Sequence, residues 1–505
     1  GFSIYGGKAR YYNNIHLSHD GLKGEGNLEY LNSKSNAKEL FFFPDSTNFY
    51  TQSFIINEVS KGIEFPNVKN IDTYVHFEPF KDRMMIYQID DEFNFYNSLA
   101  TFSGNLLMRP TGLTGNGIMS IDKAKVNASL FTYNANWFGS DTASLRLFED
   151  SGLLAFKAND LKTHIDLLNR EGIFYSNGSG SYVELPANQY ISYIDKLNWN
   201  MDENSLSLGE EFSSGEGSVF ISTHSDQDSL KFLAKTAFYS LKDYVIHANG
   251  VDSILVADAM IFPDSGIITV AKNAVIQTLY SAKILADNLT QYHTFNNAIV
   301  DIKSAHKYFA SGDYIYFDGL NKTQNIFFKE IKVEEKDTVT IAKSNILADN
   351  IFHIDSLLDF KGDIYLTADQ KNLTFDGYFM INYTCSVIEK EWVSFKSIID
   401  PKNINLTLAN KIYNDKEDLL STGLVMSFDS SNFYSTFLSK KKRAAIDLNI
   451  LPASNNLIYD KSNSTYYVGS LDTLSNYYIL YDKTCKTEGH GIIDLNTNLG
   501  QFNLQ

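Results

Sequence analysis

Apolar and polar residues alternate along most of the chain. Met119, Ile121 and Val126 fall on the apolar side of this alternation, with serine, lysine and aspartate residues around them. A spacing of two residues is that of a β-strand with one buried face. Tyr314–Phe317 and Thr338–Ile341 also read as short strands. The pattern therefore predicts a protein built mainly from β-strands.

Turn signals separate these runs. Phe-Pro-Asp-Ser occurs at Phe43–Ser46 and again at Phe262–Ser265. Proline fixes φ, while aspartate and serine bond back to their own backbone, so both segments are predicted turns. Asp318-Gly319 and Asp376-Gly377 carry the Asp-Gly signal of a two-residue hairpin loop. We expect both pairs to lie at hairpin tips.

A glycine-containing phrase occurs twice in the first part of the chain. Gly21–Leu28 returns 91 residues later as Gly112–Met119. A looser similarity relates Phe102–Leu106 to Phe360–Ile364. Glycine inside a strand marks a bulge or a close approach of two backbones. We therefore expect structural roles for four glycines: Gly24, Gly26, Gly115 and Gly117.

Repetition of this kind is typical of stacked β units. It predicts an all-β, elongated β-repeat fold, either a solenoid or a β-taco or jellyroll-like stack, with at most one or two short helices. The single helix candidate runs from Leu230 to Tyr244, where apolar residues also recur at helical spacing.

The expected organisation has four parts. Residues 1–206 form a glycine-punctuated repeat region with two copies, and residues 207–228 form a polar linker. Residues 229–350 form a region of stacked β rungs. Residues 351–505 form a C-terminal β-repeat region, which we expect to continue beyond the chain end because the chain has the character of a processed or excised piece.

Composition narrows the function. The chain has 505 residues, of which 44% are hydrophobic and 20% charged, as in a packed protein rather than a disordered one. The net charge of −17 argues against nucleic-acid binding, which needs a clustered basic face. Lys440–Arg443 is the one basic run, and we interpret it as a solvated loop.

Cysteine content and hydropathy add little. Cys385 and Cys485 could form one disulfide or remain two buried thiols. The sequence contains no apolar run long enough for a transmembrane helix and no recognisable signal segment.

Candidate chemistry is sparse, and we expect no catalytic residue, no cofactor and no metal ion. The nucleophile-elbow, Walker A, dinucleotide-binding and H-E-x-x-H motifs are missing from the sequence. Asp90–Glu92 and Glu210-Glu211 are carboxylate runs, but neighbouring strand residues point to opposite faces, so we interpret them as solvated turns. His16, His19 and Asp20 form the one close cluster with metal-ligand chemistry, and two or three such residues alone make a weak site.

Ligand binding stays open. The 31 tyrosines could supply a carbohydrate-binding surface, and an open apolar seam in a β fold would hold lipid.

Several short phrases resemble known proteins. Gly7–Arg10, the two repeat phrases and Ala282–Asp287 resemble large uncharacterised cell-envelope β-repeat proteins of Bacteroidota and, more remotely, the β-jellyroll repeats of lipopolysaccharide-transport proteins. This resemblance implies a stacked β fold and an envelope location, and it transfers no catalytic residue.

A modification motif is similar to one found in exported Bacteroidota proteins. It consists of Asp, then Ser or Thr, then an aliphatic residue, and it implies O-glycosylation. The acceptors would be Thr142, Ser229, Ser253, Thr338, Ser356 and Thr473.

These observations favour a non-enzymatic structural or interaction subunit of an exported, outer-membrane-associated assembly. Its location would be the periplasm, the outer membrane or the cell surface. Its partners would be other envelope proteins, with lipid or glycan as further candidates. Two alternatives remain: a periplasmic lipid or glycolipid carrier with an apolar β-groove, and a polysaccharide-active β-helix enzyme.

Overall fold

The computed structural model confirms the all-β prediction. It describes residues 1–178, 181–209, 217–333, 338–350, 352–429, 432–440, 442–470, 475–495 and 502–504. Strands make up 62% of the structure, and the described residues contain no helix of seven or more residues. The chain divides into two compact units, Gly1–Ile254 with Ser265–Gln277 and Leu255–Asp264 with Thr278–Gln505. The boundaries of the four regions expected from the sequence stay predictions.

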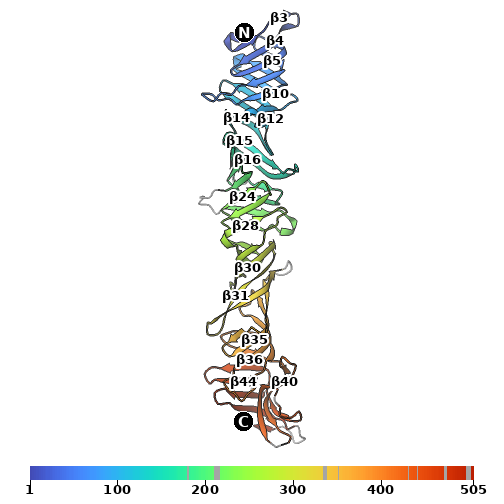
Figure 1. The fold of residues 1–505 in the computed structure, drawn as a ribbon, viewed down its shortest axis with the longest axis vertical. Helices are drawn as coiled ribbons and strands as arrows, with labels where there is room; N and C mark the ends of the chain where they lie inside the picture. Colours follow the sequence, from blue (N-terminus) through green and yellow to red (C-terminus); the bar gives the residue numbers. More distant parts are fainter. Residues whose placement is uncertain are drawn as a thin grey trace. The chain divides into compact units, whose positions relative to one another are not determined.

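The first unit begins with strands drawn in blue in Figure 1. They pair antiparallel with their neighbours, and their buried positions alternate with exposed ones. The elements are β1 (Phe2–Ile4), η1 (Tyr5–Gly7), β2 (Ala9–Tyr12), β3 (Ile15–Ser18), β4 (Gly21–Tyr30), β5 (Ser33–Phe42), β6 (Thr47–Tyr50), β7 (Ser53–Ile56), β8 (Val68–Asn70), β9 (Thr73–Glu78), η2 (Pro79–Lys81) and β10 (Arg83–Gln88).

The next strands repeat this arrangement. They are β11 (Phe93–Phe95), η3 (Tyr96–Ser98), β12 (Ala100–Arg109), β13 (Gly112–Ile121), β14 (Ala124–Tyr133) and β15 (Trp137–Phe148). Every pairing of β1 to β5 has a counterpart 91 residues later. Examples are Phe2 with Tyr11 and Phe93 with Phe102, Ile15 with Gly24 and Leu106 with Gly115, and Gly26 with Ala37 and Gly117 with Ala128. The repeated phrase therefore marks one structural unit built twice.

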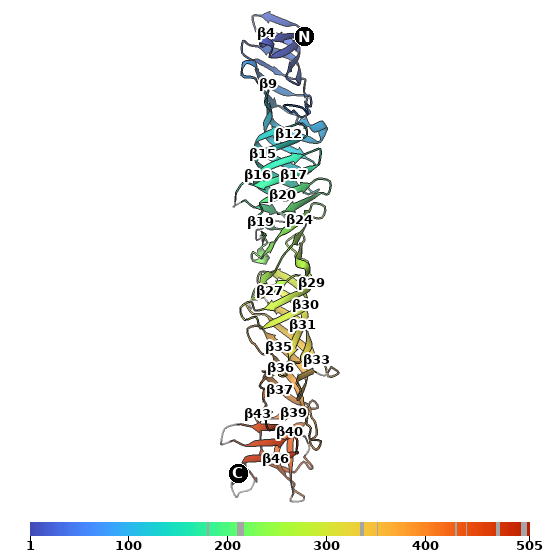
Figure 2. The ribbon, with the colours of Figure 1, turned by 90° about the vertical axis from the view of Figure 1, so that its left-hand side faces the viewer.

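The remainder of the first unit continues with short antiparallel strands. Figure 2 shows β15, β16 and β17 as neighbours, in agreement with their pairing. The strands are β16 (Leu154–Asp166), β17 (Glu171–Ser176), β18 (Val183–Leu185), β19 (Tyr190–Ser192), β20 (Lys196–Asn200), β21 (Ser205–Leu208), β22 (Ser218–Ser222), β23 (Lys231–Ala234), β24 (Thr236–Ser240), β25 (Val245–Asn249) and β28 (Ile267–Val270), with the short turn η4 (Ser225–Gln227).

The helix expected from Leu230 to Tyr244 is wrong. This segment forms β23 and β24, and its buried residues alternate with period two. Leu233, which a helix would have placed on the buried face, is 38% exposed. Aromatic and β-branched residues such as Thr236 and Tyr239 favour a pleated surface and decide the outcome. Within the segment expected to be a linker, β22 pairs with β19 and β23.

The second unit is also antiparallel. Its strands are β27 (Ala259–Phe262), β29 (Leu279–Ala286), β30 (His293–Ser304), β31 (Lys307–Phe317), β32 (Thr323–Val333), β33 (Ile341–Ile346), β34 (Phe352–Asp355), β35 (Leu358–Thr367), β36 (Thr374–Ile381), β37 (Val393–Ile398), β38 (Asn405–Thr407), β39 (Ile412–Tyr413), β40 (Leu419–Met426), β41 (Phe433–Ser439), β42 (Leu448–Pro452), β43 (Asn456–Asp460), β44 (Thr465–Gly469), β45 (Tyr477–Tyr481), β46 (Lys486–Ile493) and β47 (Phe502–Leu504). The chain passes from one unit to the other at three places: within the strand β26 (Ile254–Val256), within the turn η5 (Asp264–Gly266), and between Gln277 and Thr278.

Three of the four predicted turns are present. Phe43–Ser46 connects β5 to β6, Asp264–Gly266 forms η5, and Asp318-Gly319 lies between β31 and β32. Asp376-Gly377 is not a hairpin tip, contrary to the prediction. It lies inside β36, where Gly377 pairs with Gly362 of β35. The turn preference of the Asp-Gly pair is weaker than the pairing of the long strands β35 and β36, which holds both residues in extended backbone.

A disulfide joins Cys385 to Cys485 in the second unit, with the two Cα atoms 5.4 Å apart. Next to it, the Asp482 carboxylate accepts hydrogen bonds from the backbone N–H groups of Thr384 and Cys385, at 2.8 and 3.1 Å. The bridge therefore fixes two segments that are 100 residues apart in sequence.

Candidate functional site

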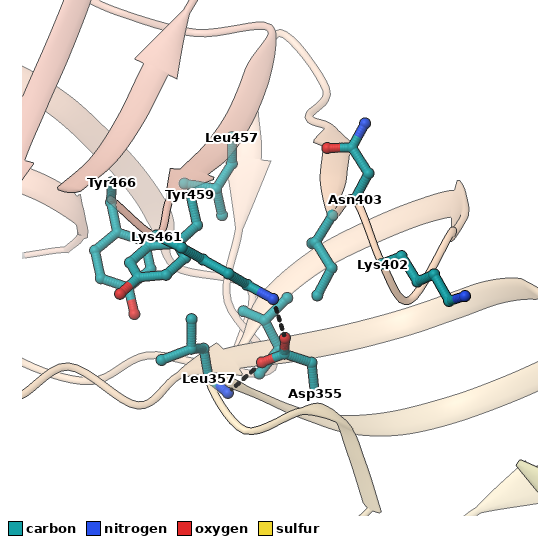
Figure 3. A pocket seen from close by; sticks show the side chains of 10 residues that line it. Asp355, Leu357, Lys402, Asn403, Leu457, Tyr459, Lys461 and Tyr466 are labelled. Atoms are coloured by element: carbon teal, nitrogen blue, oxygen red, sulfur yellow. Dashed lines mark hydrogen bonds and ion pairs between the residues drawn. The ribbon is translucent and has the colours of Figure 1, made fainter. Parts of the chain in front are cut away.

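The best-defined pocket lies in the second unit and has a volume of about 170 Å³. Figure 3 shows its lining, which comes from the turn after β34, the turn before β38, and strands β43 and β44. Leu357, Leu457 and Ile404 supply apolar walls, and Tyr459 and Tyr466 supply aromatic ones. Asp355 and Lys461 are the charged groups that face each other in it.

Asp355 is the central polar group of the pocket. Its side chain is only 2% exposed, because it lies at the end of β34 under the turn that leads to β35. One carboxylate oxygen, Oδ1, accepts the backbone N–H of Leu357 at 2.6 Å and the hydroxyl of Ser356 at 3.3 Å. The other oxygen, Oδ2, is 4.0 Å from the Lys461 ammonium. That distance is too long for a hydrogen bond and leaves room for a small group that donates to Oδ2 and accepts from Lys461.

The two tyrosines pack against each other. The ring centroids of Tyr459 and Tyr466 are 4.7 Å apart, and Tyr383 meets Tyr466 edge to face at 5.3 Å. Burial, with a smaller contribution from the Asp482 charge, raises the pKa of Tyr466. The Tyr466 hydroxyl is buried and has no hydrogen-bond partner within the described protein. The pocket therefore combines an aromatic wall with two groups of opposite charge, the Asp355 carboxylate and the Lys461 ammonium.

This arrangement does not provide the chemistry of a glycosidase. Such enzymes use two carboxyl groups on either side of the scissile bond. Among the ten residues that line the pocket, Asp355 is the single carboxylate. What the pocket can do is hold a small neutral molecule that both donates and accepts hydrogen bonds.

A wider hollow of about 290 Å³ lies elsewhere in the second unit. Tyr292, Tyr314, Tyr316 and Phe317 contribute to its lining. The Tyr314 hydroxyl bonds to Nδ1 of the buried His293 at 3.1 Å, and burial raises the pKa of Tyr314 to about 12. The Tyr314 hydroxyl in this hollow is thus already engaged in the fold, whereas the Tyr466 hydroxyl of the first pocket has no hydrogen-bond partner among the described residues.

The four repeat glycines lie at equivalent places. A β-bulge interrupts the pairing of β4 with β5 between Gly24 and Gly26, and the same bulge interrupts β13 and β14 between Gly115 and Gly117. Gly26 and Gly117 have φ angles of +134° and +151°, a region that favours glycine. The sequence signal for this structural role was the repetition itself.

The other candidate residues are dispersed. His16 lies in β3, while His19 and Asp20 contact each other at 3.0 Å in the turn that follows. Within the described residues, no group of three metal-ligand side chains comes together. Asp90, Asp91 and Glu92 are exposed between β10 and β11, and Glu210-Glu211 lies outside the described residues.

The expected O-glycosylation acceptors are mostly accessible. Thr142, Ser229, Thr338 and Ser356 are exposed, and Ser253 is half-buried. Thr473 lies outside the described residues. Glycosylation of these residues stays a prediction.

Comparison with protein-family models, curated proteins and solved structures found no match. The described part of the chain contains no helix with the length and hydrophobicity needed to cross a membrane.

Proposed function

We propose that this chain is a non-enzymatic structural and interaction subunit of an exported assembly associated with the bacterial outer membrane. The observation that carries the proposal is the repeat of β1–β5 in β11–β14, with each pairing between these strands reproduced 91 residues later. Repeats that stack in this way bury a continuous core and present extended surfaces, which suit binding to other proteins.

The disulfide supports the exported location. Disulfides form and persist in oxidising compartments such as the periplasm and the cell surface, and they are rare in the reducing cytosol. Cys385 is buried at 2% exposure, so the bond is part of the packed structure of the second unit.

The test is purification of the tagged chain from native envelopes without denaturation. The proposal predicts a complex with at least one other envelope protein at a fixed ratio, and a Cys385–Cys485 bond that resists thiol labelling until reduction. A monodisperse chain with no partner, or free thiols in the cell, would contradict it.

The Asp355 pocket favours a second candidate function, the binding of a neutral polyhydroxylated molecule such as a sugar unit. A ligand hydroxyl between Oδ2 and the Lys461 ammonium would donate to the first and accept from the second, while Tyr459 would pack against the carbon face of a ring. This activity is compatible with a subunit that contacts envelope glycans.

A further inference from the structure

The two hollows of the second unit meet at one turn, formed by residues 400–404. Residues 400–402 contribute to the lining of the wider hollow, and residues 402–404 contribute to that of the Asp355 pocket. Lys402 therefore belongs to both linings, and Figure 3 shows its side chain extending away from Asp355. The hollows are adjacent, so one ligand can contact both across this turn.

The turn between the hollows is fixed in place. The backbone N–H of Asn403 donates to the Asp400 carbonyl oxygen at 3.0 Å, and that of Lys402 donates to the Asp400 carboxylate at 2.9 Å. The turn also packs closely on Gly319, where an added Cβ would collide with the Pro401 carbonyl oxygen. The fold therefore sets the relative positions of the two hollows before a ligand binds, which lowers the cost of ordering on binding.

The size of the hollows favours a ligand that occupies both. Small-molecule sites usually enclose roughly 300–1,000 Å³. The Asp355 pocket has about 170 Å³ and the wider hollow about 290 Å³, so each alone falls below that range. A molecule that fills both would have a site of ordinary size.

Exposed aromatic rings line the wider hollow. Phe317 is 56% exposed and Tyr292 is 49% exposed. The side chains of Asn321, Lys371 and Asn372 lie in the same lining, and none of the three has a hydrogen-bond partner among the residues that the structure describes. Ring faces beside available amide and ammonium groups suit the carbon face and the hydroxyl groups of a sugar.

The charges of the combined lining favour a neutral ligand. The lining contains three lysines and three aspartates: Lys371, Lys402, Lys461, Asp318, Asp355 and Asp400. These charges balance, so the site offers no net attraction to an anion or to a cation. A neutral chain of sugar units fits, because each unit is uncharged and presents both hydroxyl groups and an apolar face.

We propose that the Asp355 pocket and the wider hollow are two subsites of one binding site for a neutral oligosaccharide. One sugar unit occupies the Asp355 pocket, the chain crosses the turn at Lys402, and a second unit packs against Phe317 and Tyr292. The inference rests on the sugar-binding candidate of the proposed function and extends it from a single sugar unit to a chain.

Calorimetric titration of the full chain tests the second subsite. The probes are maltotriose, cellotriose and β-1,4-mannotriose, each compared with the methyl glycoside of its own sugar. At least one trisaccharide should bind roughly tenfold more tightly than its methyl glycoside, because the second subsite adds aromatic contacts. Equal affinities for trisaccharides and methyl glycosides would overturn the proposal.

A variant of the wider hollow should remove this gain. Phe317→Ala should lower the affinity for the best trisaccharide about tenfold. Phe327→Ala is the matched control, because Phe327 is 50% exposed in the same sheet and lines neither hollow. Unchanged affinity in Phe317→Ala, or an equal loss in both variants, would contradict the proposal.

Hydrogen exchange of the unaltered chain gives a second readout. The best trisaccharide should slow exchange at residues 355–358 and also at residues 317–321, because both segments lie at the site. Protection at residues 355–358 alone would overturn the second subsite.

The outcomes also separate this inference from the function on which it rests. Binding of a methyl glycoside that Asp355→Asn weakens, with no gain from any trisaccharide, would retain the sugar pocket and remove the second subsite. If neither the methyl glycosides nor the trisaccharides bind, the sugar-binding candidate fails and this inference fails with it.

Discussion

Gly104 of β12 and Gly117 of β13 lie directly opposite each other, and neither position has room for a side chain. A Cβ added to Gly104 would lie 2.9 Å from the Gly117 Cα, and one added to Gly117 would lie 2.8 Å from the Gly104 Cα. Both residues have φ near +150°, at +154° and +151°. The second unit contains the same relationship, since Gly362 pairs with Gly377. The repeat thus includes a point of close backbone contact between strands.

Gly117→Val should therefore destabilise the first unit by about 1–3 kcal/mol, through backbone strain and overpacking. The measurement is a thermal melt of the full chain beside the parent. Asp91→Ala is the control and should change stability by less than about 0.5 kcal/mol, because Asp91 is exposed. If Gly117→Val melted at the same temperature as the parent while Asp91→Ala unfolded, the structural role assigned to Gly117 would be wrong. The acidic residues around Asp91 would then be the important ones.

The strand content was predictable because each strand has one buried face and therefore a period of two in its sequence. The bulges were predictable from repetition, since Gly26 and Gly117 recur in the same phrase. The error at Asp376-Gly377 shows the limit of local signals, because long-range pairing placed this hairpin-type pair in mid-strand. The same limit explains the helix wrongly expected at Leu230–Tyr244. The apolar residues of this segment fit the helical period of 3.6 residues as well as the strand period of two.

The pocket could not be predicted. Asp355, Ile404, Tyr459 and Tyr466 come from four separate segments, and each is ordinary in its own sequence context. The disulfide was one of two options, because the distance between two cysteines 100 residues apart depends on the packing of the whole second unit. Sequence patterns report local pairing well and distant packing poorly.

Removal of the disulfide should lower the stability of the second unit. A bond that closes a loop of about 100 residues contributes up to roughly 4.7 kcal/mol by restricting the unfolded chain. The double variant Cys385→Ser with Cys485→Ser should melt at a lower temperature than the parent. Reducing agent should lower the melting temperature of the parent and leave that of the double variant unchanged. An equal effect of reductant on both proteins would show that the bond does not contribute.

Glu78 should control part of the acid stability of the first unit. Its carboxylate is bound by the Arg83 guanidinium and, at 2.7 Å, by the Lys81 ammonium, which together lower the pKa of Glu78 from 4.5 to about 2. Because the folded pKa is the lower one, the stabilisation is complete above about pH 4.5 and is lost as the pH falls toward 2.

Glu78→Gln should therefore be less stable than the parent at pH 6, and the difference should shrink between pH 4.5 and pH 2. The measurement is the denaturation midpoint across this range. A difference that stays constant with pH would exclude an ionic role for Glu78.

Asp355→Asn should weaken binding of a neutral sugar to the second unit. The amide oxygen can still accept from Leu357, while the charge that would hold a ligand hydroxyl is removed. A hydrogen bond to a charged group contributes about 1.5–3 kcal/mol, so the affinity for a methyl glycoside should fall about tenfold or more.

Calorimetric titration with methyl glycosides of glucose, galactose and mannose measures this effect, and exposed Asp369→Asn is the control. Heat of binding from none of the three glycosides, or equal loss in both variants, would remove the sugar-binding function.

The measurement that tests the proposed function most directly is chemical cross-linking in intact cells that produce the protein naturally, followed by purification of the tagged full chain and identification of the adducts by mass spectrometry. The proposal predicts an adduct between this chain and at least one other exported envelope protein, at a fixed ratio. Recovery of the chain as a free monomer without any cross-linked protein would contradict the proposal.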